Sequence, residues 1–287
     1  MLDIIRYEAE VPSVSFTGGE PVTYRDLPEL IKYASKHNKM RVNLITNGTL
    51  VTPKKAKEFA RAGLSSAQVS IESAYPDEHD AITGVPGSHA ASVAGFRALK
   101  EAGIHVHPHV TICRINRDRI IDYPAFCKSI GAERFSANLV IPAGRGEDEN
   151  LTVTYSEIGD IVRRLKAEAS KTGIRFMWYS PTPVCLFNPL AEGFGNRGCS
   201  ACEGLLSVDP EGNVLPCSSW SEPVGNLLKD EFEAVWNSIR CKRIREKESA
   251  PEPCKQCRHF AACQGACPLY FNIHGHGELN SAWKKMG

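Results

Sequence analysis

Residues 199–217, CSACEGLLSVDPEGNVLPC, and residues 254–267, CKQCRHFAACQGAC, decide how the last third of this chain folds. Packing alone does not require sulfur at so many fixed offsets, so these thiols are ligands or disulfide partners. The tail from Pro251 has too few apolar residues to build a core, and we expect this part of the chain to owe its fold to what its cysteines bind. The cysteines concerned are Cys199, Cys202, Cys217, Cys254, Cys257, Cys263 and Cys267.

The composition is that of an ordinary globular protein, with 42% apolar and 23% charged residues in a chain of 287. A formal net charge of +1 favours neither a nucleic-acid surface nor an attraction to acidic membranes. Asp3, Glu8 and Glu10 lie where a signal peptide would be apolar, and no run approaches the ~20 apolar residues of a membrane span. We therefore expect a cytoplasmic protein without nucleic-acid or membrane partners, whose clustered cysteines bind metal rather than form disulfides.

Ahead of the cysteines, β-rich runs alternate with helical stretches. Thr52 and Pro53 are typical of a helix start, and Gly103 of a helix end. A repeated strand–helix order demands parallel strands with crossover helices, hence an α/β barrel or a doubly wound sheet, with functional groups at the strand ends. The expected strands lie at 11–17, 41–46, 66–73, 105–112 and 134–141, with a further one at 174–179.

The character of the sequence changes near residue 180. The pattern predicts a hairpin around Pro210–Asn213 and a helix from about Lys229 to Glu248. We expect two domains, one over residues 1–180 and a smaller cysteine-rich one over residues 181–287.

The cysteine spacing alone leaves two metals open. Paired C-x2-C segments suit tetrahedral zinc. The same spacing suits cubane iron–sulfur clusters, and Cys267 is followed by Pro268, as in bacterial ferredoxins.

A resemblance favours iron and sulfur. The pattern C-x9-G-x4-C from Cys202 to Cys217, followed by C-x2-C-x5-C-x3-C, resembles the SPASM domain, the auxiliary-cluster module of radical S-adenosylmethionine enzymes. The resemblance implies one or two auxiliary 4Fe-4S clusters with interleaved ligands. One set would be Cys199, Cys202, Cys217 and Cys267, with Cys185 competing for the place of Cys199. The other would be Cys254, Cys257, Cys263 and a later cysteine.

That later cysteine is absent from the sequence, because none follows Cys267. His274 and His276 are alternative ligands, since histidine replaces cysteine on some cluster irons. Surface histidines are the more ordinary interpretation of both.

The strand ends extend the resemblance to the α/β part. Thr17, Gly18, Gly19 and Glu20 follow the first strand, where glycines let backbone approach a ligand and a carboxylate suits an ammonium group. They resemble the motif that holds the amino group of S-adenosylmethionine. Further positions match those near the same cofactor, the first pair toward its ribose: Ser70 and Glu72, and Thr111 and Asn116.

The sequence departs from the family pattern in its N-terminal part. No cysteine precedes Cys113, so the three thiolates of the C-x3-C-x2-C motif that hold the catalytic cluster are absent, and no catalytic residue is assigned. The resemblance therefore implies a partial radical S-adenosylmethionine (β/α)6 barrel without its first strand, and a truncated or naturally incomplete segment at the front.

The resemblance also implies the chemistry. In the family a 5′-deoxyadenosyl radical abstracts a hydrogen atom from a small molecule or peptide, auxiliary clusters accept electrons, and a ferredoxin or flavodoxin donates them. We expect an oxidoreductase of the branch that modifies peptides or tetrapyrroles, inactive as given. The alternatives are a non-catalytic iron–sulfur electron carrier or peptide-binding scaffold, and a structural zinc protein.

Overall fold

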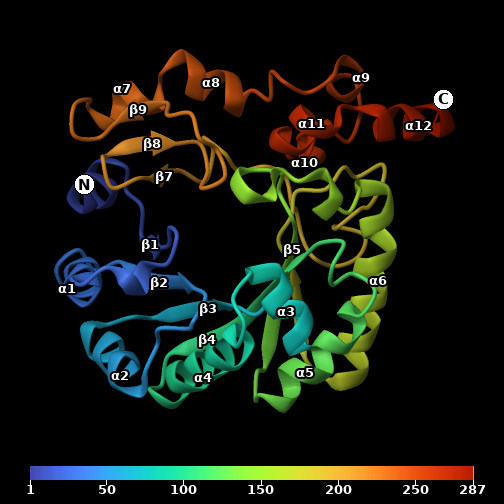
Figure 1. The fold of residues 1–287 in the computed structure, drawn as a ribbon. Coiled ribbons are helices and arrows are strands. Elements are labelled where there is room, and N and C mark those ends of the chain that lie inside the picture. Colours follow the sequence, from blue (N-terminus) through green and yellow to red (C-terminus); the bar gives the residue numbers. More distant parts are fainter. Residues whose placement is uncertain (287) are drawn as a thin grey trace. The chain divides into compact units, whose positions relative to one another are not determined.

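The computed structural model describes residues 1–286 and contains one six-stranded sheet in the order β1-β2-β3-β4-β5-β6 (Figure 1). Strand order follows chain order, as expected when each strand is joined to its neighbour by a crossover helix. The predicted α/β fold is confirmed, including the further strand near residue 175. The strands are β1 (Ser13–Phe16), β2 (Arg41–Thr46), β3 (Ser66–Ser70), β4 (His105–Ile112), β5 (Arg134–Leu139) and β6 (Arg175–Trp178).

The registers of the first four strands are parallel and uninterrupted. Val14 lies opposite Val42, and Leu44 opposite Ala67. Pro108 lies opposite Val69 within β4, so its ring is accommodated in a continuous strand. The parallel register brings the carboxyl ends of these strands to one edge of the sheet. Alternating apolar residues of the inner strands are fully buried, among them Val42, Leu44, Ala67, Val69, Val110 and Ile112.

Helices cover the sheet, and the predicted helix start at Thr52–Pro53 and helix end before Gly103 are confirmed. The Thr52 hydroxyl accepts the N–H of Lys55 (3.2 Å) at the start of α2, and Gly63 ends it in the left-handed conformation (φ 103°). The α-helices of this part are α1 (Leu27–Lys32), α2 (Pro53–Ala62), α3 (Pro76–Thr83), α4 (Ser88–Glu101), α5 (Tyr123–Ser129) and α6 (Tyr155–Thr172).

A small antiparallel sheet, β7 (Ser207–Val208), β8 (Asn213–Leu215) and β9 (Gly225–Asn226), follows, and its first two strands form the predicted hairpin. The single helix predicted over Lys229–Glu248 is wrong. Ser238 is extended (ψ 147°) and its hydroxyl accepts the N–H of Cys241 (3.3 Å), so it begins a new helix. The helices here are α7 (Phe232–Trp236), α8 (Ile239–Arg245), α9 (Glu252–Lys255), α10 (Phe260–Cys263), α11 (Pro268–His274) and α12 (Gly277–Met286).

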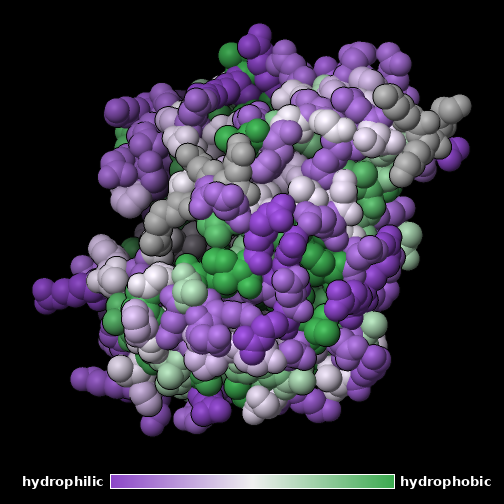
Figure 2. All heavy atoms as spheres, turned by 45° about the vertical axis from the view of Figure 1, so that its right-hand side comes forward, coloured by the Kyte–Doolittle hydropathy of each residue, from purple (hydrophilic) through white to green (hydrophobic). Residues whose placement is uncertain are grey.

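The chain forms two compact units. The strand–helix unit comprises Leu2–Ala137 and Arg164–Met177, and the cysteine unit comprises Asn138–Arg163 and the residues from Trp178 onward, together with Met1. The predicted domain boundary at residue 180 stays a prediction. No helix among residues 1–286 is both long and apolar enough to span a bilayer. Figure 2 shows one face of the molecule, on which hydrophilic side chains predominate and apolar ones are scattered.

Candidate functional site

The carboxylate of Glu20 is fixed at the carboxyl end of the sheet. Its Oε1 accepts the N–H of Val22 (3.0 Å) and the hydroxyl of Thr46 (2.7 Å), and its Oε2 accepts the N–H of Asn47 (2.7 Å). These bonds tie the segment after β1 to the end of β2.

Gly18 and Gly19, just before Glu20, lie beside open space. No atom stands within 4 Å of the position where either would carry a Cβ, and Gly18 has a φ of 137° that side chains rarely adopt. Exposed Thr17 precedes them. A loop of this kind leaves its main chain accessible to a ligand.

Glu72 lies two residues beyond the end of β3. The residue as a whole is partly exposed, but its carboxyl group is largely shielded from water. Its Oε2 accepts the N–H of Thr111 (2.7 Å). Burial raises the pKa of Glu72 to about 7, against the opposing effect of hydrogen bonds from Thr111. Ser70, at the end of β3, pairs with His109 in β4. The structure thus brings three of the predicted cofactor residues, Ser70, Glu72 and Thr111, to adjacent strand ends.

Asn116 is completely buried and binds main chain on every side. Its Nδ2 donates to the carbonyls of Glu72 (2.8 Å) and Thr111 (2.9 Å), and its Oδ1 accepts the N–H of Cys113 (2.9 Å). Asn116 therefore joins the loops after β3 and β4. Its predicted contact with a cofactor stays a prediction.

His79 in α3 takes part in the same arrangement and was not anticipated from the sequence. Its Nδ1 accepts the N–H of Glu72 (2.9 Å), so the proton lies on Nε2, which is buried without a hydrogen-bond partner. Burial lowers the pKa of His79 to about 4, so the ring is neutral near pH 7. The signal available in the sequence was a histidine seven residues after Glu72, which is too weak to interpret.

The first thiol group consists of Cys199, Cys202, Cys217 and Cys267. The pKa of Cys267 is raised to about 12, chiefly by burial and also by repulsion from Cys199 and Cys217, while the N–H groups of Tyr270 and Leu269 act in the opposite direction. Burial likewise raises the pKa of Cys217, and repulsion from Cys199 raises this pKa as well. The pKa of Cys202 is raised by burial first, then by Cys241 and Cys199.

Cys241, a buried free thiol in α8, is therefore a neighbour of Cys202. It has none of the spacing that marks the other cysteines, which is why sequence reasoning missed it.

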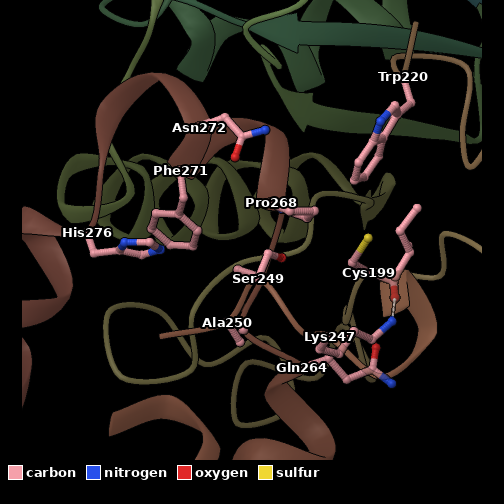
Figure 3. Close-up of a pocket in the computed structure, with 13 residues that line it drawn as sticks. Cys199, Trp220, Lys247, Ser249, Ala250, Gln264, Pro268, Phe271, Asn272 and His276 are labelled. Atoms are coloured by element: carbon pink, nitrogen blue, oxygen red, sulfur yellow. Dashed lines mark hydrogen bonds between the residues drawn. The ribbon is translucent and has the colours of Figure 1, made fainter. Parts of the chain in front are cut away.

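Two cations hold the segment Cys199–Cys202. Arg245 Nε donates to the carbonyl of Cys202 (2.7 Å), and Lys247 Nζ donates to the carbonyl of Cys199 (2.6 Å; Figure 3). Cys199, Lys247 and Trp220 line one small cavity of about 50 Å³. Positive charge beside cysteine ligands offsets the negative charge that thiolates bring.

The second thiol group consists of Cys254, Cys257, Cys263 and Cys185. The pKa of Cys254 is raised to about 11, chiefly by burial and also by repulsion from Cys263, Cys185 and Cys257. The pKa of Cys185 is raised to about 11, chiefly by burial and next by repulsion from Cys263. The sequence suggested Cys185 as a competitor of Cys199 in the first group, whereas the structure places it among the thiols of the second.

Main-chain N–H groups point at several of these sulfurs. The N–H of His259 donates to Cys257 Sγ and that of Val184 donates to Cys263 Sγ, both at 3.4 Å. The N–H groups of Ser219 and Trp220 reach Cys217. Such donors stabilise sulfur in its thiolate form and tune clusters bound by it.

The donor set suits iron–sulfur clusters. All eleven cysteines are free, and those of each group lie within electrostatic reach of one another. Within residues 1–286, no three His, Cys, Asp or Glu side chains are arranged to hold a single metal ion. That finding concerns one ion with ligands at about 2.3 Å. A cubane binds its four thiolates through four different irons, so they stand further apart.

Comparisons with family models match both units. Residues 1–126 match the radical SAM superfamily, and residues 199–258 match SPASM, an iron–sulfur cluster-binding domain. The AdoMet-dependent heme synthase of Nitratidesulfovibrio vulgaris is 28% identical over 92% of this chain and 76% of its own. The mycofactocin maturase MftC of Mycobacterium ulcerans is 30% identical over 88% of this chain and 69% of its own.

The fold is also that of solved structures. Streptococcus suis SuiB bound to its precursor peptide SuiA superposes with a TM-score of 0.77 over 94% of this chain and 65% of that one, at 17% identity. This similarity supports the fold alone.

Proposed function

Because the chain belongs to the radical SAM superfamily and carries a SPASM iron–sulfur cluster-binding domain, we propose that it binds S-adenosylmethionine and two auxiliary 4Fe-4S clusters. The S-adenosylmethionine site would lie at the carboxyl ends of β1 to β4. The clusters would be held by the two thiol groups. The proposed enzyme class is an oxidoreductase that modifies a peptide or a tetrapyrrole.

One observation carries the proposal for the clusters. Cys263 and Cys267 are four positions apart, yet Cys263 belongs to the second thiol group and Cys267 to the first. Between them Gln264, Gly265 and Ala266 all have positive φ (54°, 73° and 64°). Left-handed backbone is unfavourable for residues other than glycine and is retained where function requires it. This segment supports a module with two interleaved clusters.

The residues of the strand–helix unit have separate roles in the proposed cofactor site. The open main chain at Gly18 and Gly19 and the charged carboxylate of Glu20 suit the ammonium group of S-adenosylmethionine. Ser70 and Glu72 would meet the ribose, whose hydroxyls can donate to a carboxylate or accept from a carboxylic acid. Thr111 would lie beside it, and Asn116 and His79 would hold the main chain of Glu72 in place.

The residues of the two proposed sites support the binding of S-adenosylmethionine at the strand ends and of auxiliary clusters at the thiol groups. The auxiliary clusters would accept electrons in the proposed reaction. The relative named AdoMet-dependent heme synthase and another relative, the PqqA peptide cyclase of Gluconobacter oxydans, support the two substrate classes.

Two further parts of the proposal concern the cell. A ferredoxin or flavodoxin would exchange electrons with the clusters. Eleven free thiols suit a reducing compartment, and the cytoplasm is the proposed location.

Metal analysis tests the clusters. The full chain, purified without oxygen and reconstituted with iron and sulfide, is expected to hold about eight iron and eight sulfide ions, as two cubanes require. Zinc in place of iron, with no acid-labile sulfide, would contradict the proposal and favour a structural zinc protein.

Equilibrium dialysis with labelled S-adenosylmethionine tests the cofactor site. Glu20→Gln is expected to weaken binding about tenfold, because one charge-assisted contact contributes on the order of 1.5 kcal/mol. Glu58→Gln, an exposed change in α2, is the matched control and should bind like the unchanged protein. Equal affinities for both variants would argue against the site.

A further inference from the structure

The turn that carries Cys185 is joined directly to the second thiol group. The N–H groups of Leu186 and Phe187 both donate to the carbonyl of Pro183 (2.9 Å each), which closes a tight turn around Val184 and Cys185. At this turn the N–H of Val184 donates to Cys263 Sγ (3.4 Å). The residue next to Cys185 is thus in contact with a sulfur of C-x2-C-x5-C.

The turn is held firmly on its other side. Phe187 is buried (1% exposed) and packs on Gly159 of α6, where an added Cβ would stand 3.3 Å from its ring. The Arg163 guanidinium lies 5.5 Å from the centre of the same ring. Tyr155 donates its hydroxyl to the carbonyl of Pro181 (3.0 Å). Cys185 is therefore presented by a fixed segment, as a ligand should be.

Main-chain hydrogen bonds join the three cysteines of the C-x2-C-x5-C run. The N–H of Cys257 donates to the carbonyl of Cys254 (3.0 Å), the N–H of Phe260 to the carbonyl of Cys257 (2.9 Å), and the N–H of Cys263 to the carbonyl of His259 (2.9 Å). The tail histidine His276, in contrast, lines the cavity beside Cys199 of the first group. The second group therefore gains its fourth sulfur from upstream in the chain.

We propose that Cys185 is the fourth protein ligand of a 4Fe-4S cluster bound by Cys254, Cys257 and Cys263. This inference rests on the proposed function and specifies the ligands of one of its two clusters. Binding converts four thiols to thiolates and releases four protons, while the iron and sulfide ions come from the reconstitution mixture. The cluster then has a protein ligand on every iron, with no open coordination site and no need of a later cysteine.

Iron, sulfide and electron paramagnetic resonance measurements on the full reconstituted chain test the proposal. Cys185→Ala leaves one iron without a thiolate, so mild oxidation is expected to remove about one iron per chain and to produce the signal of a three-iron cluster. Cys127→Ala, which removes a buried thiol in α5 of the other unit, is the matched control and should keep all its iron.

A double variant keeps the test decisive if the single change also disturbs folding. Substitutions of residues that bind the same cluster do not have additive effects. Cys185→Ala combined with Cys254→Ala should therefore lose at most the four irons of one cluster and keep the other cluster complete. Cys185→Ala combined with Cys217→Ala should affect both clusters.

The outcomes separate this inference from the function on which it rests. Unchanged iron content and spectra in Cys185→Ala, with two clusters present in the unchanged protein, overturn the ligand assignment alone. Loss of more than four irons in the Cys185–Cys254 pair also overturns it, because it would mean that the two residues bind different clusters. An unchanged protein without acid-labile sulfide overturns the proposed function and this inference together.

Discussion

The Tyr155 hydroxyl accepts the backbone N–H of Cys267 at 3.4 Å, at the start of α6. The rings of Tyr155 and Tyr270 lie 4.0 Å apart, and Tyr270 donates to Glu278 (2.5 Å). A buried tyrosine far from the cysteines in sequence therefore positions the main chain of a proposed cluster ligand.

Replacing Tyr155 by Phe tests this support. The change leaves the N–H of Cys267 and the carbonyl of Pro181 without their partner, at a cost of about 1–3 kcal/mol in the free energy of unfolding. Urea denaturation of the reconstituted protein measures it. Tyr24→Phe, at a residue that is 54% exposed, should change little. Equal stability of the two variants would show that the hydroxyl is unimportant.

The raised pKa of Glu72 predicts a pH dependence of stability. The folded protein holds this proton up to about pH 7, whereas the unfolded chain loses it near 4.5. The free energy of unfolding should therefore fall as pH rises between these values, by at most about 1.4 kcal/mol per pH unit, and level off above pH 7.

Glu72→Gln removes that titration. Urea midpoints measured from pH 5 to pH 8, without S-adenosylmethionine, should fall less steeply for the variant than for the unchanged protein. The matched exposed change is Glu58→Gln, which should keep the original slope. Parallel profiles for Glu72→Gln and the unchanged protein would mean that the carboxyl titrates normally.

Removing the Asn116 side chain should destabilise the proposed cofactor site and leave the thiol groups unaffected. Asn116→Ala leaves buried main-chain groups of Glu72, Thr111 and Cys113 unpaired, and we expect a loss of about 1–3 kcal/mol in unfolding free energy. Affinity for S-adenosylmethionine should fall as well, while iron content stays the same. Exposed Asn280→Ala in α12 is the control. An unchanged denaturation midpoint for Asn116→Ala is the contrary result.

A close backbone approach between α4 and the end of β2 gives the last prediction. An added Cβ on Gly95 would stand 2.1 Å from the carbonyl oxygen of Gly48, which cannot move without displacing Asn47 from Glu20. Gly95→Ala should therefore destabilise the protein by about 1–3 kcal/mol and weaken S-adenosylmethionine binding.

The control for this change is Gly277→Ala, at the start of α12, where an added Cβ meets nothing within 4 Å. Alanine there should be neutral or slightly stabilising. Similar denaturation curves for both variants would contradict the close approach.

Local signals in the sequence predicted most of the fold. Apolar strand runs separated by helices ending at Gly103 or Gly173 determine a parallel α/β sheet, because each signal acts within a few residues. The break at Ser238 was missed, since the helix pattern on either side continues through it and the cap reveals itself only by its hydrogen bond.

The sequence by itself determined which residues are proposed for the chemistry, at the strand ends and among the clustered cysteines, because residue type and spacing indicate groups suited to bind metal or cofactor. Only the tertiary structure decided which sulfurs belong together. Cys185 and Cys263 are far apart in the chain, and the N–H of Val184, in the turn at Pro183, donates to Cys263 Sγ. Such long-range proximity comes from packing, which no local pattern encodes.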